Sequence, residues 1–191
     1  MGKYVQIAMI EERKPPCVVS CPVLTDTRLY AQKISEGKYE DALEILLKAN
    51  PFSSVCGRIC HHPCEKGCRR AKVDSAVSLR MLKRFVVENT AEYRKSRKRR
   101  PQAQLHKKIA IVGSGPSGMT AANDLALEGY AVTVFEKAEQ PGGMLHLALP
   151  RYRLPYSVVQ TDIEDILSLG VALKCGGGGQ GPHPGRAQAS A

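Results

Sequence analysis

Cysteines near the N-terminus are the side chains whose type and spacing are best suited to chemistry. Six of them fall within the first 68 residues: Cys17, Cys21, Cys56, Cys60, Cys64 and Cys68. In a chain without a secretory signal, such thiols serve more often as metal or redox ligands than as disulfides. The later cysteines recur every four residues, which on an unbroken helix would set them in one stripe, but Gly57, Pro63 and Gly67 argue against such a helix. We therefore expect an irregular segment that turns the thiols toward one centre. All six are predicted metal ligands.

The residues leave two kinds of metal site open. Pro22 directly follows Cys21, as in the Cys-Pro ending of ferredoxin cluster-binding runs, and this favours an iron–sulfur cluster. His61 and His62 keep zinc as the competitor, because zinc accepts mixed thiolate and imidazole ligands. Cys175 begins a low-complexity tail and is not expected to be a ligand.

A glycine-rich loop between two apolar segments is the second candidate site. Residues 109–112 and 131–135 are predicted strands, and a helical pattern lies between them. Gly113 allows the turn out of the first strand, Gly115 lets the backbone approach a pyrophosphate, and Gly118 lets the helix pack on the sheet. The helix N-terminus favours an anion. This βαβ unit predicts a dinucleotide site, against the alternative of an ordinary glycine-rich turn.

The acidic residue expected to bind the ribose lies at the end of this unit. Glu136 follows the second strand and is placed to accept hydrogen bonds from a ribose diol. The predicted cofactor-binding residues are Gly113, Gly115, Pro116, Ser117, Gly118, Glu136, Lys137, Gly143 and Arg153.

Two amphipathic helices separate the cysteine pair from the later cysteines. The first is capped by Thr25 or Asp26 and runs to Gly37, and the second occupies residues 39–47. Their apolar faces are expected to pack on each other.

Charge and composition exclude several classes of function. The net charge is +10, but six positive charges fall within residues 94–100, and a solvated helix end followed by a linker explains them better than a nucleic-acid patch without interleaved aromatic residues. No apolar stretch suits a membrane span or a secretory signal, so a cytoplasmic protein is expected. The catalytic residues are unknown, and no nucleophile–base pair supports hydrolytic chemistry.

Several segments together resemble one family. CVVSCP, ISEGKYEDALEILLKANPF, CGRICHHPCEKGCRR and KVDSAVSLRMLKRF precede the glycine loop, and Pro141, Gly142 and Gly143 follow it. Over residues 15–174 the chain is similar to the glutamate synthase small-subunit family, which includes the N-terminal part of dihydropyrimidine dehydrogenase. The resemblance, rather than spacing alone, implies FAD in the first nucleotide unit, 4Fe-4S clusters in the helical domain, and NADPH bound by a later domain.

Departures from that family limit which ligands are carried over. The Cys-x-x-Cys pair that two-cluster members have upstream of Cys17 is absent, and Lys83 stands near their Gln or Glu ligand. We therefore expect one cluster rather than two. The resemblance assigns Cys21, Cys60 and Cys64 to one cluster, and leaves the fourth ligand open among Cys17, Cys56 and Cys68.

The resulting fold class is α plus α/β. We expect an α-helical 4Fe-4S domain (1–93), a basic linker (94–106), an incomplete Rossmann-like FAD domain (107–174) and a disordered low-complexity tail (175–191), the last indicating a truncated, frame-shifted or appended end. The resemblance implies an oxidoreductase that passes electrons from NADPH through FAD to the cluster and to a partner subunit, and a chain of this length is expected to be inactive alone. The alternatives are a non-catalytic electron-transfer module and a zinc-binding nucleic-acid adaptor.

Overall fold

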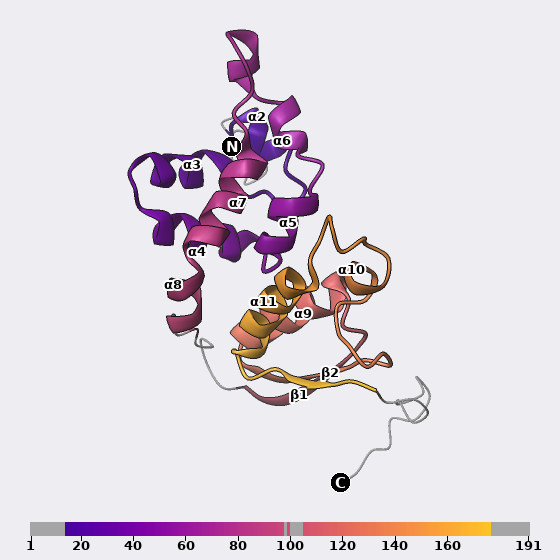
Figure 1. The fold of residues 1–191 in the computed structure, drawn as a ribbon. Helices are drawn as coiled ribbons and strands as arrows, with labels where there is room; N and C mark the ends of the chain where they lie inside the picture. The colour runs from indigo at the N-terminus through magenta and orange to yellow at the C-terminus, as the bar shows by residue number, and fades with distance from the viewer. Residues whose placement is uncertain (1–13, 98, 100–104, 177–191) are drawn as a thin grey trace, which may run out of the picture. The chain divides into compact units, whose positions relative to one another are not determined.

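The computed structural model describes residues 14–97, 99 and 105–176, which form two compact units divided between Ser96 and Arg97 (Figure 1). The predicted tail lies outside the described residues from position 177 onward, and the predicted linker lies outside them at 98 and 100–104. No helix in the described ranges is long and apolar enough to cross a membrane.

The first unit is helical, as predicted. Its elements are α2 (Pro16–Val19), α3 (Thr27–Ser35), α4 (Tyr39–Ala49), α5 (Ser53–Ile59), α6 (Pro63–Lys66), the 3-10 helix η1 (Arg69–Lys72), α7 (Leu79–Asn89) and α8 (Ala91–Ser96). Asp26 caps α3 by accepting a hydrogen bond from the Leu29 N–H at 3.0 Å. The apolar faces of α3 and α4 pack together with α7 around Tyr30, Leu43 and Val86.

Two short helices shape the segment of the later cysteines, which was expected to be irregular throughout: Cys56 lies in α5 and Cys64 in α6, whereas Cys60 and Cys68 lie outside the helices. α5 contains Cys56 and also Gly57, which was expected to oppose helix formation. A Cβ at Gly57 would lie 3.1 Å from the Arg84 Cα, a tight contact that favours glycine where α5 approaches α7. The helix ends at Cys60, and His62 then adopts a left-handed backbone with φ 50° before Pro63 begins α6.

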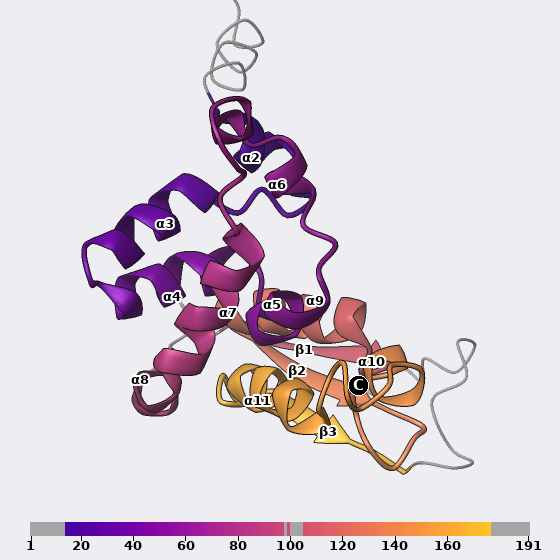
Figure 2. The ribbon, with the colours of Figure 1, turned by 45° about the horizontal axis from the view of Figure 1, so that its top comes forward.

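The second unit is the start of a Rossmann-like α/β fold, as predicted. Its elements are β1 (Leu105–Val112), α9 (Pro116–Leu127), β2 (Tyr130–Phe135), α10 (Met144–Leu147), α11 (Tyr156–Leu167) and β3 (Ala172–Lys174). The strands are parallel in the order β1-β2-β3. α9 and α11 lie side by side over one face of this sheet (Figure 2). Val159, Ile163 and Ile166 form the buried apolar side of α11.

Three arginines of the basic segment, Arg94, Arg97 and Arg99, are held within the fold rather than on a solvated patch. Arg94 is 5% exposed and donates to the Ser54 Oγ at 2.7 Å within the first unit. In the second unit Arg97 donates to Asp165 Oδ2 at 2.7 Å, and Arg99 donates to Asn123 Oδ1 at 2.7 Å. Residues 97 and 99 therefore belong to the packing of the α/β unit, an arrangement that a charge run in the sequence does not reveal.

Candidate metal centre and nucleotide loop

A small cavity in the helical unit brings together four of the six predicted metal ligands. Cys21, Cys56, Cys60 and Cys64 all line it, and its volume is about 30 Å³. Cys17 and Cys68 are not among the described residues that line the cavity. Cys17 packs against the helical core, as Cys64 also does, and Cys68 directly precedes η1.

The four thiols that line the cavity come from different parts of the backbone. Cys21 follows α2, Cys56 lies within α5, Cys60 ends that helix, and Cys64 lies in α6. The left-handed residue His62 makes the turn between the last two cysteines. A continuous helix would instead set Cys56, Cys60 and Cys64 in a row along one face, so the break between α5 and α6 is what lets them surround a space.

Polar groups already contact these sulfur atoms. The Asn50 side-chain N–H donates to the Cys56 Sγ at 3.1 Å, and the His62 backbone N–H donates to the Cys60 Sγ at 3.3 Å. The Cys21 Sγ lies 3.6 Å from the Thr25 hydroxyl. Donors of this kind stabilise thiolate and are one of the features that set the potential of iron–sulfur sites.

The thiols differ in acidity. Burial opposes ionisation of Cys21, but hydrogen bonds from Thr25 and the Val23 backbone, together with the charge of Lys83, lower its pKa overall. Burial, reinforced by the neighbouring Cys21 and the Glu65 carboxylate, raises the pKa of Cys64 to about 11. Backbone hydrogen bonds, the Val77 one first, lower the pKa of Cys68. Ligation of Cys64 therefore requires a metal that displaces its proton.

Two cationic side chains from α7 also line the cavity: Lys83, which the resemblance placed near the position of a cluster ligand, and Arg80, which the sequence analysis did not single out. Arg80 and Lys83 are three residues apart on one helix face. The Arg80 backbone N–H donates to Glu65 Oε1 at 2.9 Å, and its Nη1 donates to the Cys60 carbonyl at 3.4 Å. Of the two histidines that kept zinc as an alternative, His62 lines the cavity and His61 is exposed.

The donor set suits a cluster. Among the residues the structure describes, no three His, Cys, Asp or Glu side chains converge closely enough to share one metal ion. The four thiols are instead distributed around a space, and a cubane cluster takes one thiolate at each of its irons. The buried Nε of Arg80 has no hydrogen-bond partner in the described part of the chain, and cluster sulfur would supply an acceptor.

In the glycine loop of the α/β unit, backbone conformation or packing explains Gly113 and Gly118 but not Gly115. Gly113 has φ 96°, a left-handed value that favours glycine. A Cβ on Gly118 would collide with the Gly113 carbonyl oxygen. No described atom lies within 4 Å of a Cβ placed on Gly115, so protein packing does not explain this glycine.

Glu136 is fixed beside that loop by the residue between the first two glycines. Its Oε2 accepts from the Ser114 N–H at 2.8 Å and from the Ser114 Oγ at 2.6 Å, and its Oε1 accepts from the Ala138 N–H at 2.9 Å. Burial opposes ionisation, but these hydrogen bonds outweigh it and lower the pKa of Glu136. A carboxylate offers about four acceptor positions, so room remains for one further donor.

The remaining predicted cofactor residues lie around the same end of the sheet or on exposed turns. A Cβ on Gly143 would lie 2.9 Å from the Gly115 Cα, so the second glycine pair touches the loop. The Gly142 N–H donates to the Ser114 Oγ at 3.1 Å. Exposed positions are taken by Pro116, Ser117, Lys137 and Arg153. Sequence reasoning missed Ser114, although its place between Gly113 and Gly115 was visible.

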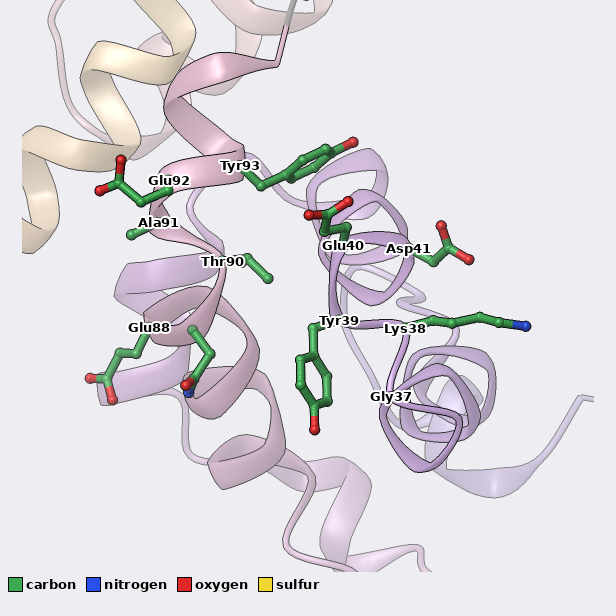
Figure 3. A pocket seen from close by; sticks show the side chains of 11 residues that line it. Gly37, Lys38, Tyr39, Glu40, Asp41, Glu88, Thr90, Ala91, Glu92 and Tyr93 are labelled. Carbon is green, nitrogen blue, oxygen red and sulfur yellow. The ribbon is translucent and has the colours of Figure 1, made fainter.

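A larger cavity in the helical unit contains none of the predicted site residues. Its volume is about 490 Å³, and it lies between residues 37–41 and residues 88–93 (Figure 3). Tyr39 projects between the two segments, and its ring packs edge-on against Phe85. Glu88, on the rim, is paired with Arg58 and Arg84 at 2.7 and 2.8 Å and so serves the fold.

Comparison with protein-family models assigns the two units separately. Residues 10–95 match the family described as dihydropyrimidine dehydrogenase domain II, 4Fe-4S cluster. Residues 111–158 match the NAD(P)-binding Rossmann-like domain. The first match covers every predicted cysteine ligand, and the second covers Gly113 to Arg153.

Curated relatives carry both units in the same order. The NADPH-Fe(3+) oxidoreductase subunit beta of Geobacter sulfurreducens is 40% identical over 166 residues, which are 86% of this chain and 25% of the relative. The NADP(+)-dependent formate dehydrogenase subunit beta of Moorella thermoacetica is 39% identical over 183 residues, with 83% and 25% covered. The NAD-dependent dihydropyrimidine dehydrogenase subunit PreT of Escherichia coli K12 is 35% identical over 162 residues, with 84% and 39% covered.

The chain thus spans between a quarter and two-fifths of the length of these relatives. It is homologous, over more than four-fifths of its own length, to a 4Fe-4S and Rossmann-like portion of NAD(P)-dependent oxidoreductase subunits.

Proposed function

We propose that this chain is the iron–sulfur and FAD-binding portion of an NAD(P)H-dependent oxidoreductase subunit of the glutamate synthase small-chain type. In that role it passes electrons from NADPH through FAD to one 4Fe-4S cluster and onward to a partner subunit. The observation that carries the proposal is the meeting of Cys21, Cys56, Cys60 and Cys64 at one cavity. The names of the relatives support the nicotinamide donor and the partner subunit.

The four cavity cysteines are the proposed ligands, with Cys56 as the fourth. Cys17 and Cys68 are left outside this set, because neither is among the described residues that line the cavity. When bound, a cluster carries one electron at a time, a function that the side chains of the protein do not supply. The chain contributes the donors from Asn50 and the His62 backbone, which hold two of the thiolates in place.

FAD is the proposed occupant of the glycine loop. The support is the contact of Gly143 with Gly115, since a backbone without side chains at both positions allows a large planar cofactor to pass close by. Bound flavin divides the two electrons of a hydride into single-electron steps. Glu136 is proposed to accept from the ribose, with Ser114 holding its carboxylate in the orientation required.

Anaerobic reconstitution tests the metal proposal. Iron and acid-labile sulfide are measured in the wild type, in Cys56→Ala and in the matched control Cys68→Ala. About four irons and four sulfides per chain are expected in the wild type and in the control, and a large loss in Cys56→Ala. Zinc without sulfide in the wild type refutes the cluster. Loss in Cys68→Ala with retention in Cys56→Ala refutes the ligand set.

A further inference from the structure

Two cations line the cavity beside its thiols, whereas the Glu65 carboxylate, which accepts from the Arg80 backbone N–H, is not among the lining residues. These cations are Arg80 and Lys83, and no Asp or Glu occurs among the lining residues in the described part of the chain. Both cations project from the same face of α7, so the rigid helix fixes their positions relative to the thiols. The cavity is therefore built for a group with net negative charge.

Arg80 is held at the cavity from two sides. Its backbone N–H binds the Glu65 carboxylate at 2.9 Å, and its Nη1 reaches the Cys60 carbonyl at 3.4 Å. Its Nε is buried and finds no hydrogen-bond partner in the residues the structure describes. A buried donor without an acceptor is uncommon in folded proteins and calls for an explanation. Thiolate or sulfide placed in the cavity provides the missing acceptor.

We propose that Arg80 and Lys83 are the counter-charges of the cluster and raise its reduction potential by stabilising the reduced state. This rests on the proposed function, in which the cavity holds a 4Fe-4S cluster. With four thiolates an oxidised cluster is dianionic, and one electron from an external reductant makes it trianionic without forming or breaking a bond. Neighbouring positive charge therefore favours the reduced side.

The size of the effect follows from the partial exposure of both cations. Opposite charges a few ångströms apart interact strongly at the effective dielectric of a protein surface, but solvent screens side chains that are only half-buried. Removing one charge should change the ratio of reduced to oxidised cluster about tenfold at a fixed solution potential. For a one-electron couple, this corresponds to a decrease of ~59 mV in the reduction potential of the cluster.

The experiment is a redox titration of reconstituted protein, with dithionite as reductant and the electron paramagnetic resonance signal of the reduced cluster as readout. Lys83→Met and Arg80→Met remove one charge each, whereas Lys83→Arg and Arg80→Lys keep it. Lys48→Met removes an exposed charge of the same unit away from the cavity. Lower potentials are expected in the two Met variants at the cavity, with wild-type potentials in the remaining three.

Iron and sulfide contents separate the possible failures. A wild type without iron and sulfide overturns the proposed function, and this inference with it. A wild-type cluster whose potential is unmoved in both cavity Met variants, or moved equally by Lys48→Met, overturns the inference alone. If a Met variant loses its cluster while its charge-conserving partner keeps it, charge is required for binding, which supports the inference. If both the Met variant and its charge-conserving partner lose the cluster, the shape of the side chain rather than its charge is responsible, and the inference is overturned.

Discussion

Two single variants of the nucleotide loop, Gly118→Ala and Gly115→Ala, should distinguish an effect on folding from an effect on cofactor binding. At Gly118 the new methyl group would collide with the Gly113 carbonyl oxygen and lie 3.4 Å from the Ile111 Cγ2. Gly113 cannot yield easily, because its N–H donates to the Phe135 carbonyl at 2.8 Å and holds it to β2. At Gly115, φ is −66° and no described atom lies within 4 Å of the methyl position, so alanine fits.

The magnitudes follow from these contacts. Overpacking lowers the free energy of unfolding by about 1–3 kcal/mol where side chains can adjust. The new methyl group of Gly118→Ala would clash with hydrogen-bonded backbone, so we expect a loss at or above the upper end of that range. A loss of about 3 kcal/mol lowers the melting temperature of a small domain by ~12–24 °C. Gly115→Ala should change stability by less than about 0.5 kcal/mol. Its methyl group would stand where the pyrophosphate approaches, and we expect FAD affinity to fall about tenfold or more, ~1.4 kcal/mol.

The assay pairs thermal unfolding, followed by circular dichroism, with titration of FAD fluorescence. Gly118→Ala should unfold early, and Gly115→Ala should unfold with the wild type but bind FAD weakly. Wild-type melting of Gly118→Ala would show that the helix and the loop are not packed as described. Wild-type FAD affinity of a well-folded Gly115→Ala would show that the pyrophosphate does not approach at this residue.

Three further outcomes are expected. Asp165→Ala should destabilise the α/β unit by about 3–5 kcal/mol in a chemical unfolding experiment, since it leaves its two guanidinium partners buried, and an unchanged midpoint would contradict the ion pair. In iron-free protein at pH 7, iodoacetamide should modify Cys68, whose pKa is lowered, before Cys64, whose pKa is raised to about 11, and peptide mapping by mass spectrometry with the reverse order would refute these environments. Glu136→Ala should cost about 1–3 kcal/mol in thermal unfolding by leaving three donors without their acceptor, whereas the exposed Glu139→Ala should be neutral, and equal effects would deny Glu136 its structural role.

The parts of the fold that sequence could predict are those set by local signals. The cap at Asp26, the apolar stripe of α4 and the strand–glycine–helix order of the α/β unit are each contained within a short segment. Gly57 was misjudged for the same reason: intrinsic propensity disfavours it in a helix, but the close approach of Arg84, which comes much later in the chain, requires it.

The composition of the candidate site depended on contacts between distant segments. Spacing alone could not choose among Cys17, Cys56 and Cys68, because the break after α5 decides which thiols face one space. The resemblance placed Lys83 near the position of a cluster ligand, but nothing in the sequence indicated that Arg80 would lie beside the thiols, because that depends on the packing of α7. Likewise, the arginine run gave no sign that Asp165 and Asn123, more than 20 residues away, would bind it.

The first strand also determines how the α/β unit should behave at high concentration. In the described residues β1 is an edge strand, and the Val112 side chain at its end is 78% exposed. Parallel sheets are normally covered on both faces, and an open edge invites pairing with another molecule. The exposed Lys107 and Lys108 oppose such pairing by charge repulsion. Because the screening length falls from ~10 Å at 0.1 M salt to ~3 Å at 1 M, self-association should increase as salt is added.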